Sequence, residues 1–86
     1  MTTLTYEVRA TKIWFDDYNL WVTLHDGRQL AVPLAYFPKL LSASAQQREE
    51  YVFSGQGTGI HWDELDEDIS VEGLIQGIGD RGKEMK

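Results

Sequence analysis

Apolar and polar residues alternate in the first third of the chain, as they do in strands with one buried face. The alternation runs through residues 6–11, where Tyr6, Val8 and Ala10 are the apolar positions, and it returns over residues 20–25. Because successive side chains of a strand point to opposite faces, a period of two predicts that both segments are half-buried strands.

An apolar run at residues 13–15 interrupts this alternation, which predicts a bulge or a change of face in the first strand. Residues 16–19 supply turn chemistry. Asp26 and Gly27 are typical of a two-residue hairpin, because a type I′ turn needs positive φ at both positions. A third strand is expected over residues 30–32, which completes a three-stranded antiparallel meander.

Short helices become the expected elements in the middle of the chain. Pro38 suits the first turn of a helix, where its missing N–H costs nothing. Ser44 and Gln47 have the spacing of a capping box, which predicts a second helix from there to about Tyr51. The apolar residues expected to cover one face of the sheet are Leu40, Leu41, Tyr51 and Val52.

The last third begins with glycines at alternate positions in residues 55–59, which lead into an apolar stretch at residues 60–62. Glycine within a strand often marks a bulge, so we predict a short or bulged fourth strand. After an acidic loop, Ser70 is the expected N-cap of a final helix. Gly77 or Gly79 is expected to end that helix.

These patterns together predict an α+β fold, a three- to four-stranded antiparallel meander with two to three short helices packed on one face. The 86 residues leave room for a single domain, expected over residues 1–79, with residues 80–86 as a flexible C-terminal tail. Apolar residues make up 42% of the chain, enough for one core, which argues against intrinsic disorder.

Composition and charge narrow the functional classes. The chain has no cysteine, which excludes disulfides and thiol chemistry and favours a cytoplasmic location. No stretch resembles a signal peptide or approaches the roughly 20 apolar residues of a membrane span, so no membrane partner is expected. Fourteen acidic against eight basic residues give a net charge of −6, which disfavours direct binding of nucleic acid.

Three blocks of sequence resemble a known family. They are DGRQLAVPLAYFPKLL at residues 26–41, GIHW at residues 59–62 and LDEDISVEGL at residues 65–74. They resemble the bacterial family named domain of unknown function 2442, and the match runs from about Val8 to Gly77. The resemblance implies a small α+β fold and brings no established activity or catalytic residue. Relatives often have proline where this chain has Asp63, so this loop is more acidic and less rigid.

The resemblance also implies a protein partner. Some relatives are encoded beside a second small protein, of the family named domain of unknown function 4160, in an arrangement resembling toxin–antitoxin pairs. Some longer relatives append a helix-turn-helix, which this chain is too short to contain. An antitoxin-like role beside a small toxin-like protein is therefore what the resemblance implies.

A dense group of acids marks the candidate functional site. Residues 63–72 contain six carboxylates and no base. Such a loop offers electrostatic complementarity to a basic surface, which mainly governs the rate and the specificity of association. We therefore expect a non-enzymatic protein-interaction domain whose partner is small, basic and encoded nearby. The predicted partner-binding residues are His61, Asp63, Glu64, Asp66, Glu67 and Asp68.

Two alternatives come from the same residues. His61 with the acidic loop has the ligand types of a metal-binding or metal-dependent hydrolytic domain. However, a calcium loop starting at Asp66 would have Val71 where glycine is needed and Gly77 where glutamate is needed. The second alternative is a homo-oligomeric structural module that adds strands through an uncovered sheet edge.

Known catalytic patterns do not fit the rest of the segment. The glycines at residues 55–59 precede no lysine and open no helix, unlike phosphate-binding loops. Ser54 or Ser70 with His61 would resemble a serine–histidine–acid set, but no nucleophile elbow is present. The sequence therefore predicts no catalytic residue, metal site or cofactor.

The three tryptophans raise a separate question. Trp14, Trp21 and Trp62 are more large aromatic rings than one small face readily buries. At least two of the three are expected in the core, and any surplus ring would favour protein recognition.

Overall fold

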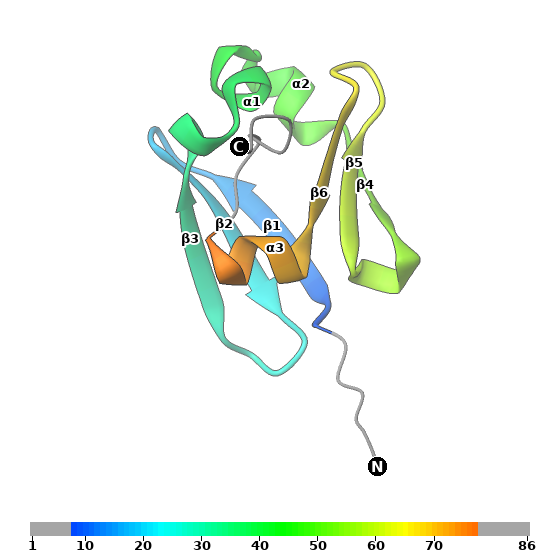
Figure 1. Ribbon diagram of the computed structural model, residues 1–86. Coiled ribbons are helices and arrows are strands. Elements are labelled where there is room, and N and C mark those ends of the chain that lie inside the picture. Colours follow the sequence, from blue (N-terminus) through cyan, green and yellow to red (C-terminus); the bar gives the residue numbers. More distant parts are fainter. Residues whose placement is uncertain (1–7, 78–86) are drawn as a thin grey trace, which may run out of the picture.

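The computed structural model describes residues 8–77 (Figure 1). Its first sheet is the predicted antiparallel meander, which the structure confirms. Leu20 and Val22 face the core while Trp21 between them faces outward, as the alternation predicts. The three strands, in the order β1-β2-β3, are β1 (Ala10–Phe15), β2 (Asn19–Leu24) and β3 (Gln29–Pro33).

The first strand lies later in the chain than predicted. Val8 precedes the strand, and Tyr6 lies outside the described residues. Ala10 pairs with Leu24 but Lys12 pairs with Thr23, so Thr11 is the extra residue of a bulge. The bulge resets the alternation, so that Ala10 and Ile13 both reach the core and the apolar run continues the strand.

A second antiparallel sheet, in the order β4-β5-β6, is the main departure from the predicted fold. The expected second helix stops at Glu49, and the following residues pair with β5. Glu67 and Asp68, expected in a loop, pair with β5 from its other side. The α+β class is confirmed, with six strands between residues 8 and 77 instead of three or four. The strands are β4 (Tyr51–Ser54), β5 (Gly59–Trp62) and β6 (Glu67–Ser70).

Short helical segments lie between the strands and after the last one. The capping box is confirmed, because the Ser44 hydroxyl accepts the Gln47 N–H at 3.1 Å and Gln47 Oε1 accepts the Ser44 N–H at 2.9 Å. Gly77 ends α3 with a left-handed backbone, and Gly79 lies outside the described residues. The segments are η1 (Leu34–Tyr36), α1 (Pro38–Ser42), α2 (Ala45–Glu49), η2 (Gly55–Gly57) and α3 (Val71–Gln76).

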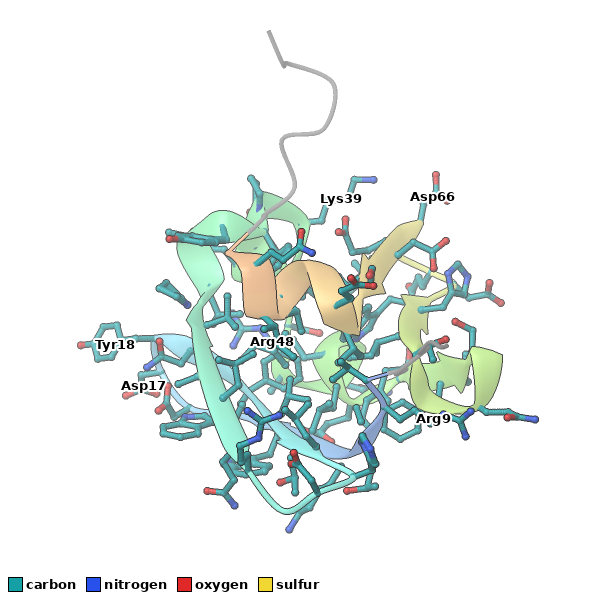
Figure 2. The ribbon with its side chains drawn as sticks, turned by 60° about the horizontal axis from the view of Figure 1, so that its bottom comes forward. Arg9, Asp17, Tyr18, Lys39, Arg48 and Asp66 are labelled. Atoms are coloured by element: carbon teal, nitrogen blue, oxygen red, sulfur yellow. The ribbon has the colours of Figure 1, made fainter. Side chains whose placement is uncertain are left out.

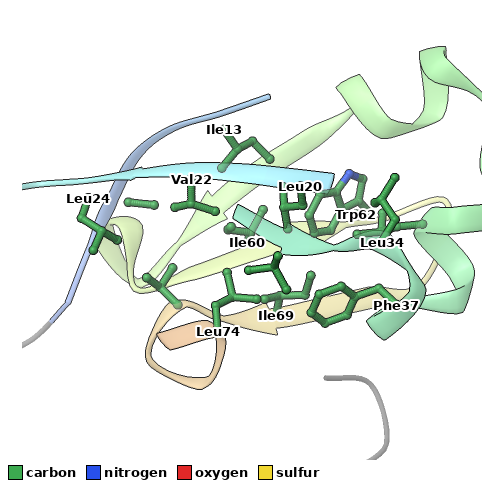
Figure 3. Packing of buried hydrophobic residues seen from close by; sticks show 14 residues of the cluster. Ile13, Leu20, Val22, Leu24, Leu34, Phe37, Ile60, Trp62, Ile69 and Leu74 are labelled. Atoms are coloured by element: carbon green, nitrogen blue, oxygen red, sulfur yellow. The ribbon is translucent and has the colours of Figure 1, made fainter. Parts of the chain in front are cut away.

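The hydrophobic core lies between the two sheets and receives side chains from α1 and α3 as well (Figure 3). Of the residues expected to cover a sheet face, Leu40 is buried and Tyr51 is partly buried. Leu41 and Val52 are exposed, contrary to the prediction. Adjacent helical residues point about 100° apart, so Leu41 faces away when Leu40 is buried, and Val52 is on the outer face of β4. The residues predicted as a C-terminal tail, 80–86, lie outside the described range.

Only Trp62 among the tryptophans belongs to the core, so the expectation of at least two was wrong. Trp14 and Trp21 are half-buried on the outer face of the first sheet. They pair across β1 and β2, and their rings stack with centroids 5.8 Å apart. Lys12 lies 5.2 Å from the Trp14 ring, and the Trp21 Nε1–H donates to Asp16 at 2.8 Å. Their mutual stacking and the contacts with Lys12 and Asp16 thus cover these two rings in part, and the rings stay outside the core.

Arg48 ties the helices to the second sheet. Its side chain donates to the Leu40 and Leu41 carbonyls at 2.9 and 3.0 Å, which satisfies the end of α1. Its own carbonyl accepts the Trp62 Nε1–H at 3.0 Å. The guanidinium also lies over the Phe15 ring, 5.7 Å from its centroid. One residue therefore connects α1, α2, β1 and β5.

None of the helices between residues 8 and 77 is long and apolar enough to cross a membrane.

Candidate functional site: the acidic β5–β6 hairpin

The candidate site is on a tight hairpin. β5 and β6 are joined by a four-residue turn in which the Asp66 N–H donates to the Asp63 carbonyl at 3.2 Å. Asp66 has a positive φ of 54°, a conformation that aspartate and asparagine tolerate better than most residues. The turn holds the acids at the tip of the hairpin and away from the core.

α1 supports this tip from the side. The Lys39 Nζ donates to the Asp66 carbonyl at 2.8 Å and lies 4.0 Å from Glu67 Oε1. Figure 2 shows the Lys39 and Asp66 side chains on the same side of the molecule. A lysine far away in sequence therefore helps to hold the shape of the turn.

Five of the six predicted residues lie on the outer surface of this hairpin. The side chains of Asp63 and Asp68 are 97% and 78% exposed, and Glu64 and Asp66 are exposed as well. His61 is half-buried. We call this group the acidic hairpin surface, and it consists of His61, Asp63, Glu64, Asp66 and Asp68.

Glu67 does not belong to the predicted surface. In β6 the buried and exposed residues alternate, so Glu67 and Ile69 face the core while Asp68 faces solvent. Glu67 is 4% exposed and pairs across the sheet with Trp62. A buried carboxylate cannot contact a partner, and its nearness to Lys39 gives it a structural role.

His61 is the centre of the acidic hairpin surface. Its Nε2 lies 2.9 Å from Asp63 Oδ1 and its Nδ1 lies 3.2 Å from Asp68 Oδ1. His61 and Asp68 are direct cross-strand partners, and Asp63 follows β5 immediately. A ring flanked by two carboxylates is best satisfied as the imidazolium, which donates from both nitrogens.

The hydrogen bond with Asp63 is the largest cause that raises the pKa of His61 above its ordinary value of 6.5. Partial desolvation opposes this rise, and the hydrogen bond with Asp68 and the charges of both carboxylates reinforce it. Three of the predicted residues are therefore linked into one ionic unit.

Replacing Asp63 with asparagine is expected to lower the pKa of His61, because the largest stabilising contact of the imidazolium loses its charge. A proton NMR titration of the His61 ring measures this pKa, and Asp17→Asn is a control for the general loss of one exposed negative charge. Equal His61 titration in Asp63→Asn and in wild type would contradict the geometry.

The same contact predicts how stability depends on pH. Because the folded pKa is raised, the stabilisation is fully present below the unfolded value of about 6.5 and is lost as the pH rises through the folded pKa. Urea unfolding should therefore show that the free energy of unfolding falls as the pH rises from about 6.5 through the folded pKa of His61. The fall should be smaller in Asp63→Asn.

The candidate metal ligand His61 and the Ser70 hydroxyl have other contacts within the described residues. Between residues 8 and 77 no group of three or more histidine, aspartate or glutamate side chains is arranged to hold a metal ion. The Ser70 hydroxyl accepts the Gly73 N–H at 3.1 Å as the cap of α3. Both nitrogens of His61 face carboxylates, so neither is directed at a serine hydroxyl.

Two solved structures resemble this fold. A protein of unknown function from Rhodospirillum rubrum ATCC 11170 is 35% identical, with a TM-score of 0.78, and the match covers 94% of this chain and 100% of that protein. An uncharacterised protein from Chromobacterium violaceum, solved by NMR, is 22% identical with a TM-score of 0.67. That match covers 80% of this chain and 65% of the other, and at this low identity it shows a shared fold alone.

No curated protein matches the sequence of this chain. The sequence profile of the family described as "Protein of unknown function (DUF2442)" matches residues 10–80, which includes both sheets and the acidic hairpin surface. Together with the Rhodospirillum relative, this match confirms the family that the sequence blocks indicate. The chain belongs to the DUF2442 family.

Proposed function

We propose that this domain binds a basic protein through the acidic hairpin surface and acts by binding rather than by catalysis. The observation that carries the proposal is the exposure of the carboxylates. Asp63 and Asp68 remain largely open to solvent although each contacts His61, and Glu64 and Asp66 are exposed beside them. Four carboxylates on one hairpin outnumber the single imidazolium.

The electrostatics favour a basic partner. Carboxylates of one sign on a projecting tip attract an oppositely charged protein and raise its association rate. The net charge of −6 adds to this attraction at longer range. The tip is also preorganised by the Asp66 turn and by Lys39, so little order has to be gained on binding.

Two contacts support binding over catalysis. His61 is held by carboxylates on both sides, and Ser70 is held as a helix cap, so neither is directed at the other. An antitoxin-like role is the specific form of the proposal, in which the acidic hairpin surface covers part of a small toxin-like protein encoded nearby.

Co-expression with the protein encoded next to it tests this proposal. We expect the two proteins to co-purify, and we expect the double variant Asp66→Asn/Asp68→Asn to weaken the complex by roughly tenfold or more, chiefly through slower association. Surface plasmon resonance at two salt concentrations measures both rate constants. The effect should shrink at high salt, because exposed charges are screened.

The matched control is Asp17→Asn/Glu49→Gln, which removes the same two charges from exposed positions outside the acidic hairpin surface. It should leave binding within about twofold of wild type. Equal losses in the two double variants would show a general charge effect and would contradict a binding site on the hairpin. Failure of the neighbouring protein to bind at all would remove the antitoxin-like role.

A further inference from the structure

β4 is an open edge of the second sheet. Within residues 8–77 its backbone is hydrogen-bonded to β5 alone, and Figure 1 shows it as the outermost strand of that sheet. An edge strand presents unpaired N–H and C=O groups, which proteins usually protect with lysine, proline or a covering segment. β4 has the sequence YVFS and contains neither residue.

The side chains of β4 are also apolar and accessible. Val52 is 58% exposed on the outer face, beside its cross-strand partner His61. Phe53 is 37% exposed although it continues a row of core residues, Ile69 and Ile60, across the sheet. The apolar inner layer therefore reaches the surface at β4, where a further strand would cover it.

We propose that β4 pairs antiparallel with β4 of a second copy of this chain, with the two-fold axis at Val52. Residues directly opposite each other in a sheet share a face. Tyr51 and Phe53 both belong to the inner face, and their rings lie edge to face with centroids 5.5 Å apart. The register centred on Val52 places Tyr51 of each copy opposite Phe53 of the other, which gives two aromatic pairs.

This register makes β4 self-complementary. The two aromatic pairs on the inner face are cross-strand combinations that stabilise sheets. The valine pair on the outer face removes apolar surface from water. A two-fold axis uses the same patch on both copies, so one segment supplies every partner. The β4-β5-β6 sheet of one copy and that of the second copy would then form one continuous sheet of six strands.

The charges beside β4 favour the antiparallel arrangement. In the proposed register Glu50, directly before β4, is opposite Ser54 of the second copy. This carboxylate therefore meets no other carboxylate across the new pairing. A parallel, in-register arrangement would instead place Glu50 opposite Glu50, which is destabilising.

The size of the contact sets the expected strength. Strands of four residues give an interface at the low end for specific complexes, so the dimer should dissociate with a constant on the order of 10⁻⁴ M. Because each copy has a net charge of −6, added salt should strengthen the association. This response is the opposite of that expected for the basic partner at the acidic hairpin surface.

Sedimentation equilibrium tests the proposal. Wild type at about 1 mM should have a weight-average mass at least about 1.3 times that at about 0.02 mM. Val52→Lys and Val52→Glu should each stay monomeric, because each places like charges at the axis. Circular dichroism checks that both variants fold, which the exposure of Val52 favours. An equimolar mixture of the two variants should associate again, since lysine then opposes glutamate.

Ile75→Lys is the matched control, because it places the same charge at an exposed apolar residue of α3, and it should associate like wild type. A wild type that stays monomeric at about 1 mM would overturn the proposal, and so would a mixture of the two charged variants that stays monomeric. A monomer that instead binds a synthetic peptide of alternating valine and lysine would assign the edge to a basic segment, and would also overturn it.

Discussion

Replacing Trp62 with alanine is expected to destabilise the protein by about 3 to 5 kcal/mol, the largest effect of any substitution considered. The side chain is 1% exposed and packs against Phe15 and Tyr51, with ring centroids 6.5 and 6.3 Å away. Its Nε1–H also donates to the Arg48 carbonyl. Alanine would leave a large cavity between the sheets and an unsatisfied carbonyl. A domain of this size has a total stability of roughly 5 kcal/mol, so only about 0 to 2 kcal/mol should remain.

Trp62→Phe separates the contribution of ring packing from that of the hydrogen bond to the Arg48 carbonyl. Phenylalanine keeps an aromatic ring between Phe15 and Tyr51 but cannot donate to Arg48, so a loss of about 1 to 2 kcal/mol is expected. Urea unfolding followed by circular dichroism measures both variants. If Trp62→Ala cost less than about 1 kcal/mol, the site would have to collapse around the cavity, and Trp62 would not be central to the core.

Replacing Gly57 with alanine is expected to cost about 2 to 4 kcal/mol. Gly57 has a φ of +100°, which is unfavourable for any residue with a Cβ. A Cβ built at this position lies 2.7 Å from the Ala10 carbonyl oxygen. Because that oxygen belongs to the backbone, relief requires the β4–β5 connection to move away from β1. The substitution should therefore loosen the second sheet from the first.

Gly27→Ala is the matched control for the backbone strain. Gly27 has a similar φ of +94°, but a Cβ built there has no atom within 4 Å. Its loss should be about 1 to 2 kcal/mol, from the unfavourable φ alone. The difference between the two variants measures the steric contact with Ala10. Equal losses in thermal or urea unfolding would show that the loop relaxes freely, against the close approach seen here.

The features that could be predicted from sequence are those with local causes. Ser44 and Ser70 cap their helices, and the chain turns between β2 and β3 where predicted. The predicted type I′ geometry was wrong, because Gly27 has a positive φ and Asp26 does not. Each cap or turn depends on residues within about four positions, so the pattern alone is informative. The α+β class and the family follow from the same local patterns and sequence blocks.

The strand β4 could not be predicted because a short apolar run fits a helix or a strand equally well. Residues 51–53 follow a helix with a genuine capping box, which made a continued helix the simpler interpretation. Their pairing with β5 decides the matter, since backbone hydrogen bonds to a neighbouring strand outweigh weak local propensity. The sequence raises an uncovered sheet edge as an alternative, but it does not identify β4 as that edge or Val52 as the proposed contact.

The acidic segment, too, could be predicted from the sequence only in part. Its composition identifies a charged surface, and five of the predicted residues lie on it. Which acid points inward depends on the register of β6, because a shift of one residue would exchange the faces of Glu67 and Asp68. His61 likewise meets Asp68 through cross-strand pairing, over a separation of seven positions.

The sequence by itself therefore determined the turns, the helix caps, the family and the place of the acidic segment along the chain. The tertiary structure decided which side of that segment faces solvent, how His61 is held between two carboxylates, and which strand is left at an open edge. The physical reason is that turns and caps are stabilised by neighbours in the chain. The face and register of a strand are instead set by contacts with residues distant in sequence.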